Sequence, residues 1–211
     1  MSSTTCVIGA SHAKALIENS NFAHSYIAYN ATNYERISKA LNKIGQRQTI
    51  ERILLFISPL THRGRKRGNK YNLYALNPEE VREKILYIVE ACKKVTPKTV
   101  IIEGPPRGLT YPTHPWQQSY NQICYFLQNT SGIKIIKWFT IVQAMCELPA
   151  GTRYIIESLG FQQYFQSLYM PDSVHCIKEV YIHFGHAICK LTFPKDDWSL
   201  GDVPAIGPLL L

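Results

Sequence analysis

Ile53-Leu54-Leu55-Phe56-Ile57 is a continuous apolar run of the kind found in parallel strands, which are buried on both faces of a sheet. A helix pattern follows it, in which Asn77 suits the N-cap, Pro78 the first helical position and Glu80 the third. A second apolar run, Val100-Ile101-Ile102, comes after this helix. Together the three segments predict a strand, a crossover helix and a second strand parallel to the first.

The same alternation extends in both directions along the chain. Apolar runs predict three further strands, at Cys6-Val7-Ile8, at Ser25 to Tyr29 and at Ile133 to Phe139. Stripes with helical period predict further helices at residues 34–44, 115–127 and 177–191. We therefore expect an α/β domain with five parallel strands over residues 1–192, followed by an irregular C-terminal tail over residues 193–211.

Length and composition place the chain among single globular domains. It has 211 residues, of which 45% are hydrophobic and 18% charged, and this excludes disordered, collagen-like and coiled-coil proteins. The six cysteines are widely spaced, so we expect neither a disulfide scaffold nor a zinc knuckle. We see no secretory leader and no run near the roughly 18 apolar residues of a membrane span. These features predict a soluble intracellular protein, in the cytoplasm or the nucleus.

The positive charge of the chain is concentrated in one segment. The net charge is +8, and five basic residues lie between residues 63 and 70: Arg63, Arg65, Lys66, Arg67 and Lys70. Such a stretch is ordinarily a solvated loop, but it also suits binding of phosphate groups, an anionic substrate or nucleic acid. We find no recognisable nucleic-acid-binding motif beside it.

Polar side chains follow the first predicted strand and precede the last predicted helix. Ser11 lies where strand meets helix, and the free N–H groups and the helix dipole there favour a nucleophilic oxygen. Asp172 and His175 are three residues apart, so the carboxylate can fix the tautomer of an imidazole that takes the serine proton. Helix capping is the alternative explanation for Ser11 and for Asp172, but it does not require His175. We interpret His12 as an accessory polar residue beside this site.

Two blocks of sequence, Val7-Ile8-Gly9-Ala10-Ser11-His12 and Asp172-Ser173-Val174-His175, resemble the nucleophile and Asp/His blocks of the SGNH, or GDSL-like, hydrolase family. The helix and strand between residues 77 and 107 are also similar to that family, so the resemblance covers roughly residues 5–192. It implies a three-layer, doubly wound α/β sandwich with the flavodoxin-like strand order 2-1-3-4-5. It also implies hydrolysis of an ester or acetyl group, with Ser11 as nucleophile, His175 as base and Asp172 orienting the base.

Two other blocks depart from the family pattern, and both concern the oxyanion hole. Family members usually carry a glycine after the second strand and Gly-x-Asn-Asp after the third, whereas this chain has Asn30-Ala31 and Pro59-Leu60-Thr61-His62. Loss of an asparagine donor of this kind costs about 10²–10³ in rate, so Thr61 or His62 would have to replace it. The other expected donors are the backbone N–H of Ser11 and the segment Asn30-Ala31.

Two functions therefore remain open from the sequence. The first is a serine hydrolase of a small acyl-ester substrate, which needs no cofactor and for which the histidine spacings offer no metal site. The second is an SGNH-like module, weakened or inactive as an enzyme, that binds nucleic acid or an acidic partner through residues 63–70. Such modules are similar to domains of mobile-element and viral proteins.

Overall fold

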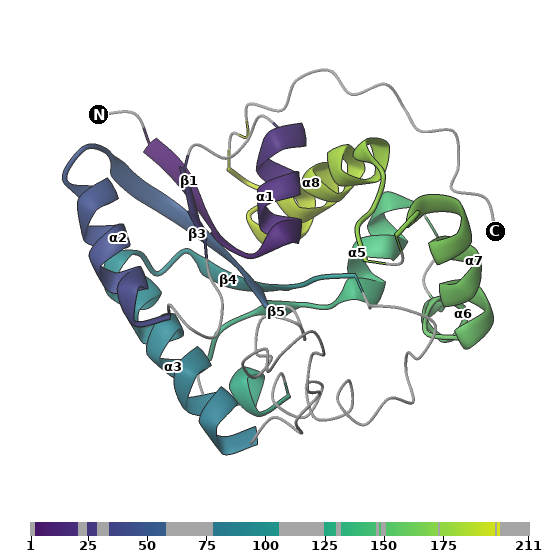
Figure 1. The fold of residues 1–211 in the computed structure, drawn as a ribbon, viewed down its shortest axis with the longest axis horizontal. Helices are drawn as coiled ribbons and strands as arrows, with labels where there is room; N and C mark the ends of the chain where they lie inside the picture. The colour runs from purple at the N-terminus through teal and green to yellow at the C-terminus, as the bar shows by residue number, and fades with distance from the viewer. Residues whose placement is uncertain are drawn as a thin grey trace, which may run out of the picture.

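Five parallel strands form the centre of the molecule, in the order β2-β1-β3-β4-β5 (Figure 1). The computed structural model describes residues 3–20, 25–28, 34–57, 78–105, 125–129, 132–146, 148, 151–172, 174–196 and 198. The strands are β1 (Ser3–Gly9), β2 (Ser25–Ala28), β3 (Thr49–Ile57), β4 (Thr99–Glu103) and β5 (Ile135–Ile136). The predicted parallel sheet and its strand order are confirmed.

Helices cover both faces of the sheet, which gives the molecule three layers (Figure 1). One face carries the short 3-10 helix η1 (Tyr34–Arg36), α2 (Ile37–Gly45) and α3 (Pro78–Val95). The other face carries α1 (Ser11–Asn19), α5 (Trp138–Met145) and α8 (Lys178–Thr192), with α6 (Arg153–Ile156) and α7 (Leu159–Tyr169) beside α5. The predicted α/β sandwich is therefore confirmed. Across the described residues, no helix has the length and apolar character needed to cross a bilayer.

The alternation of side chains along the strands divides the core into two parts. Leu54 and Phe56 of β3 pack with residues of α1, α5 and α8. Ile53 and Leu55, one position earlier in each case, pack with residues of α2 and α3. Because both faces of β3 are covered, the strand is apolar at consecutive positions, which is the pattern that marked it in the sequence.

The fifth strand is shorter than the sequence predicts. The apolar run from Ile133 to Phe139 was expected to be one strand, but β5 comprises only Ile135–Ile136 and α5 begins at Trp138. Trp138 is only 3% exposed, so the run stays apolar while the backbone changes from strand to helix. The predicted boundary was wrong because continuous burial hides the end of the strand from a hydrophobicity pattern. Residues 125–129 are helical, and the earlier part of the helix predicted from Pro115 lies outside the described residues.

The chain after α8 is fastened to the amino ends of β3 and β4. Asp196 accepts a hydrogen bond of 2.9 Å from the buried guanidinium of Arg52 and one of 3.0 Å from Lys98. The guanidinium of Arg52 also lies 4.0 Å from the centroid of the Trp198 ring. These contacts hold the first residues of the predicted tail against the edge of the sheet at which the strands begin.

Gly9 allows α1 to pack closely on the sheet, and this gives a first prediction. A Cβ added at Gly9 would lie 2.7 Å from Cβ of Ala13 and 2.8 Å from Cβ of Phe56. Both neighbours are fixed to the backbone, so Gly9→Ala should lower the free energy of unfolding by about 1–3 kcal/mol. Gly45→Ala, at the end of α2 where a Cβ meets nothing within 4 Å, should instead be neutral or stabilising by up to about 1 kcal/mol. Urea unfolding of the two variants checks both signs, and equal effects would contradict the packing argument.

Candidate active site

The N-terminus of α1 lies at the carboxyl edge of the sheet. β1 ends at Gly9, and Ser11, which is exposed, is the first residue of α1. The strand order reverses between β1 and β3, whose crossover helices α1 and α3 lie on opposite faces, and sites of open α/β sheets form at such points beyond the carboxyl ends of the strands. The first N–H groups of α1 have no partner within the helix, so they are available to an anionic group.

The turn between β1 and α1 is held by Tyr26 of β2. The Tyr26 hydroxyl lies 3.1 Å from the carbonyl oxygen of Gly9 and 3.3 Å from that of Ala10, and it donates to these oxygens. Ala10 occupies the N-cap position, and α1 has no side-chain capping bond. Capping therefore does not account for Ser11, which leaves its hydroxyl available for another role.

Asp172 and His175 form a hydrogen-bonded pair just before α8. Nδ1 of His175 donates to Oδ2 of Asp172 over 2.7 Å, and the backbone N–H groups of Val174 and His175 donate to Oδ1 over 2.9 and 2.6 Å. The N-cap of α8 is Ile177, so Asp172 does not cap that helix. The explanation as a helix cap therefore fails for Asp172 as well, and its carboxylate is hydrogen-bonded to the imidazole instead.

The hydrogen bonds to Asp172 determine the charge of its carboxylate. The bonds from the backbone N–H and the side chain of His175 hold the pKa of Asp172 well below its usual range, so its carboxylate is ionised at neutral pH. An ionised Asp172 accepts a hydrogen bond from Nδ1–H of His175, and this bond selects the tautomer of a neutral imidazole in which Nε2 has a free lone pair. Nε2 is then able to act as a base.

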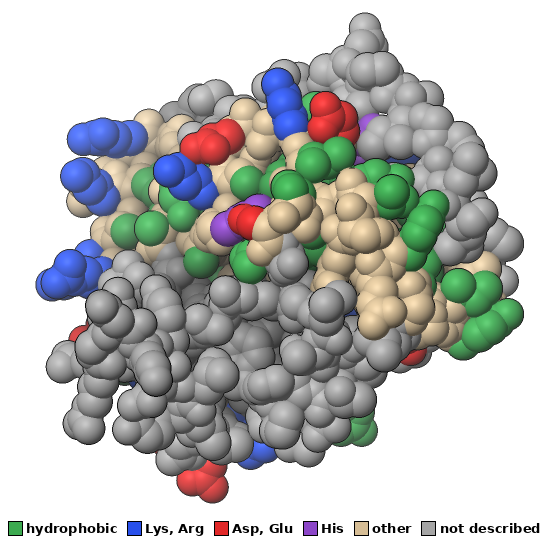
Figure 2. All heavy atoms as spheres, turned by 45° about the vertical axis from the view of Figure 1, so that its right-hand side comes forward, with side chains coloured by type: hydrophobic (Ala, Val, Ile, Leu, Met, Phe, Trp, Pro, Cys, Tyr) green, Lys and Arg blue, Asp and Glu red, His purple; other side chains and the backbone are tan. Residues whose placement is uncertain are grey.

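Contacts between α1 and α8 bring these two parts of the chain together. The ring centroids of His12 and His175 are 5.6 Å apart, and the Tyr181 hydroxyl lies 2.9 Å from Nδ1 of His12. Within the described residues, no hydrogen bond joins Ser11 to His175 directly. On the face drawn in Figure 2, histidine and acidic side chains lie next to each other among apolar ones, as an exposed Asp–His pair requires.

His12 is buried rather than exposed beside the site, with only 6% of its surface accessible. Burial lowers its pKa from 6.5 to about 4, and repulsion from His175 acts in the same direction. His12 is therefore neutral at neutral pH and adds no positive charge beside the imidazole of His175.

Two further residues near this edge of the sheet, Glu103 and Tyr181, are not indicated as site residues by the sequence. Glu103, the last residue of β4, is 8% exposed, and burial raises its pKa to about 7 despite Lys137 at 3.9 Å. Its signal in the sequence is a carboxylate at the end of an apolar run. Tyr181 was expected only on the apolar face of the last helix, and no pattern in the sequence indicates that its hydroxyl contacts His12.

The remaining predicted site residues lie outside the described residues. They comprise the expected oxyanion donors Asn30, Ala31, Thr61 and His62, and the basic segment Arg63, Arg65, Lys66, Arg67 and Lys70. Their roles stay predictions. Elsewhere in the described part of the chain, no group of three or more His, Cys, Asp or Glu side chains is arranged to hold a metal ion.

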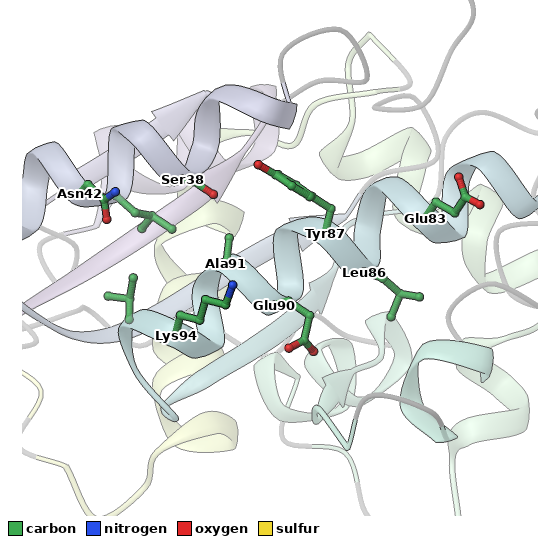
Figure 3. Close-up of a pocket in the computed structure, with 10 residues that line it drawn as sticks. Ser38, Asn42, Glu83, Leu86, Tyr87, Glu90, Ala91 and Lys94 are labelled. Atoms are coloured by element: carbon green, nitrogen blue, oxygen red, sulfur yellow. The ribbon is translucent and has the colours of Figure 1, made fainter.

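A groove of about 680 Å³ lies between α2 and α3, on the other face of the sheet from α8 (Figure 3). Tyr87 of α3 points toward Ser38 of α2 across it. Its lining residues belong to these two helices, so the groove is separate from Asp172 and His175.

Comparison with known proteins gives likenesses of structure only. No family model and no curated protein matches the sequence. Among solved structures, a member of the lipolytic G-D-S-L family from Veillonella parvula DSM 2008 is similar with a TM-score of 0.50 and 12% identity, over 92% of this chain and 100% of that chain. A short chain dehydrogenase family protein from Francisella tularensis subsp. tularensis SCHU S4 has a TM-score of 0.43 and 11% identity, over 92% and 93% of the two chains. A mutant of the esterase AlinE4 has a TM-score of 0.40 and 15% identity, over 90% and 95%.

The likeness to the lipolytic G-D-S-L protein concerns the fold. It spans nearly the whole of both chains, and the observed strand order is the one that the two sequence blocks around Ser11 and His175 imply. The resemblance to the SGNH family is thus confirmed at the level of the fold. At 12% identity it assigns neither an activity nor a catalytic residue to this chain.

Proposed function

We propose that this chain is a serine hydrolase of the SGNH type that cleaves small acyl esters or acetyl groups. The observation that carries the proposal is the Asp172–His175 pair, bonded at 2.7 Å through Nδ1 and placed beside the start of α1. A helix cap or a solvated loop does not require this pair. A base for a serine hydroxyl does.

The proposed reaction begins with attack of Ser11 Oγ on the ester carbonyl, while Nε2 of His175 takes the hydroxyl proton. The resulting imidazolium is stabilised by the ionised Asp172. His175 then gives the proton to the departing alcohol, which leaves an acyl group on Ser11. Water, activated by the same imidazole, hydrolyses this acyl-enzyme and restores the free serine.

The oxyanion of both tetrahedral intermediates needs hydrogen-bond donors. The described residues supply the backbone N–H groups at the start of α1, where the helix dipole also favours negative charge. Asn30 or Ala31 through the backbone, and Thr61 or His62 through the side chain, are the further donors that we propose. A site with fewer donors than usual should be slow rather than inactive.

A fluorophosphonate probe tests the proposal directly because it reacts only with an activated serine. The wild-type protein should be labelled, and Ser11→Ala should not. Ser38→Ala, which removes a serine from the groove between α2 and α3, is the matched control and should be labelled like the wild type. Wild-type protein that resists the probe would instead favour the inactive module that binds a partner.

A further inference from the structure

The two residues that immediately follow the proposed nucleophile and the proposed base are joined through one hydroxyl group. His12 follows Ser11, and Cys176 follows His175. The Tyr181 hydroxyl lies 2.9 Å from Nδ1 of His12 and accepts the backbone N–H of Cys176 over 3.2 Å. All three residues are buried, with 6%, 7% and 2% exposure for His12, Cys176 and Tyr181.

The chemistry of the three groups favours one arrangement of protons. The Tyr181 oxygen accepts the Cys176 N–H, and among the described residues Nδ1 of His12 is the acceptor within reach of the Tyr181 hydroxyl hydrogen, so the hydroxyl donates to Nδ1. Nδ1 is therefore an acceptor, and the single hydrogen of the neutral imidazole lies on Nε2. Burial keeps both groups neutral, because it raises the pKa of Tyr181 and lowers that of His12.

We infer that His12 and Tyr181 are positioning residues, which hold the segment of Asp172 and His175 in register with Ser11 through the chain Cys176 N–H, Tyr181 O–H and His12 Nδ1. The inference rests on the proposed hydrolase function. The side chains of Asp172 and His175 are about half exposed, at 54% and 41%, so packing around the Asp–His pair leaves it only partly fixed. The buried link directly beneath it supplies that constraint.

The expected effect is on the chemical step and not on binding of substrate. A displacement of about 1 Å between reacting groups can cost up to 100-fold in rate. Tyr181→Phe keeps the ring in the core and removes only the hydroxyl. We expect it to lower kcat for p-nitrophenyl butyrate about 10- to 100-fold, with KM changed less than twofold, and to slow fluorophosphonate labelling by a similar factor.

Substitutions at His12 distinguish this role from a contribution to stability. His12→Asn keeps an acceptor near the position of Nδ1 and should retain kcat within about threefold, whereas His12→Leu removes the acceptor and should match Tyr181→Phe. The double variant His12→Leu with Tyr181→Phe should be no slower than either single variant, because each breaks the same link. Tyr169→Phe is the control and should leave kcat unchanged, because the backbone oxygen of Tyr169 accepts the Ile177 N–H over 2.9 Å and its hydroxyl takes no part in the link.

The outcomes separate this inference from the function on which it rests. If the wild type neither hydrolyses the ester nor reacts with the probe, the proposed function fails and the positioning role fails with it. If the wild type is active and Tyr181→Phe keeps its kcat, even with a lower midpoint of urea unfolding, the link only stabilises the fold and the inference is overturned. Loss of kcat in Tyr181→Phe and His12→Leu together with retention in His12→Asn would support it.

Discussion

Asp172→Asn should lower kcat for a short acyl ester about 10³- to 10⁴-fold while the fold stays intact. The asparagine keeps Oδ1, which accepts the backbone N–H groups of Val174 and His175, so the turn before α8 is preserved. At the second position it presents an NH₂ group to Nδ1 of His175 in place of the carboxylate oxygen at 2.7 Å. An NH₂ group favours the tautomer with hydrogen on Nε2, which cannot take the proton of Ser11, and a change of this kind costs about 10⁴ in a serine triad.

Steady-state kinetics of Asp172→Asn check this prediction, with circular dichroism to show that the fold is retained. Asp196→Asn is the matched control, because that carboxylate accepts bonds from Arg52 and Lys98 at the opposite edge of the sheet and should not affect kcat. A loss of less than tenfold in Asp172→Asn would mean that His175 does not depend on the carboxylate, and the proposed triad would be wrong.

The sheet was predictable because its signal is repeated along the chain. The central strands are buried on both faces, and each therefore appears as consecutive apolar residues, such as 53–57 in β3. Residues such as Ile85, Ile88 and Val89 of α3 recur at helical spacing because only one face of that helix is buried. Periodicity contains no information about which strands are neighbours, and the order 2-1-3-4-5 was predicted from the resemblance around Ser11 and His175. Hydrophobicity alone also misplaced the end of β5, since burial continues into Trp138.

The pairing of Asp172 with His175 was predictable for a different reason. The two residues are three positions apart in the sequence, so local geometry nearly determines their contact. The contact between His12 and Tyr181 is not local, because the two are 169 positions apart in the sequence, and it depends on how α8 packs against α1. A tyrosine with a buried hydroxyl and a tyrosine that only fills the core look the same in a sequence. Long-range polar contacts inside a core therefore have to be read from the structure.

The opposite pKa shifts of His12 and Glu103 should make stability depend on pH in opposite directions. The pKa of His12 falls from 6.5 to about 4 on folding. Between these pH values the unfolded chain binds a proton at His12 and the folded chain does not, so stability falls as pH drops from about 6.5 to 4. The pKa of Glu103 rises from 4.5 to about 7 on folding. Between these pH values the unfolded chain has lost the Glu103 proton and the folded chain still holds it, so stability falls as pH rises from about 4.5 to 7. Each shift of about 2.5 pKa units corresponds to roughly 3 kcal/mol. In the wild type the two contributions largely cancel between about pH 4.5 and 6.5.

Single substitutions should reveal each contribution in urea unfolding at a series of pH values. Relative to the wild type, Glu103→Gln should gain roughly 3 kcal/mol of stability as pH rises from 4 to 7. The wild type loses stability over this range because its buried carboxyl group resists ionisation, and glutamine has no proton to lose. Relative to the wild type, His12→Asn should gain a similar amount as pH falls from 7 to 4, because it removes an imidazole that resists protonation. His186→Asn is the control: that imidazole is only half-buried and its pKa is lowered too, so the gain has the same sign but is smaller. Subtracting the wild-type free energy of unfolding from that of each variant removes the contributions of titrating groups that all the proteins share, such as Asp172 and Asp196. If neither Glu103→Gln nor His12→Asn differs from the wild type in a way that changes with pH, the pKa values of Glu103 and His12 are not shifted by burial and the prediction is wrong.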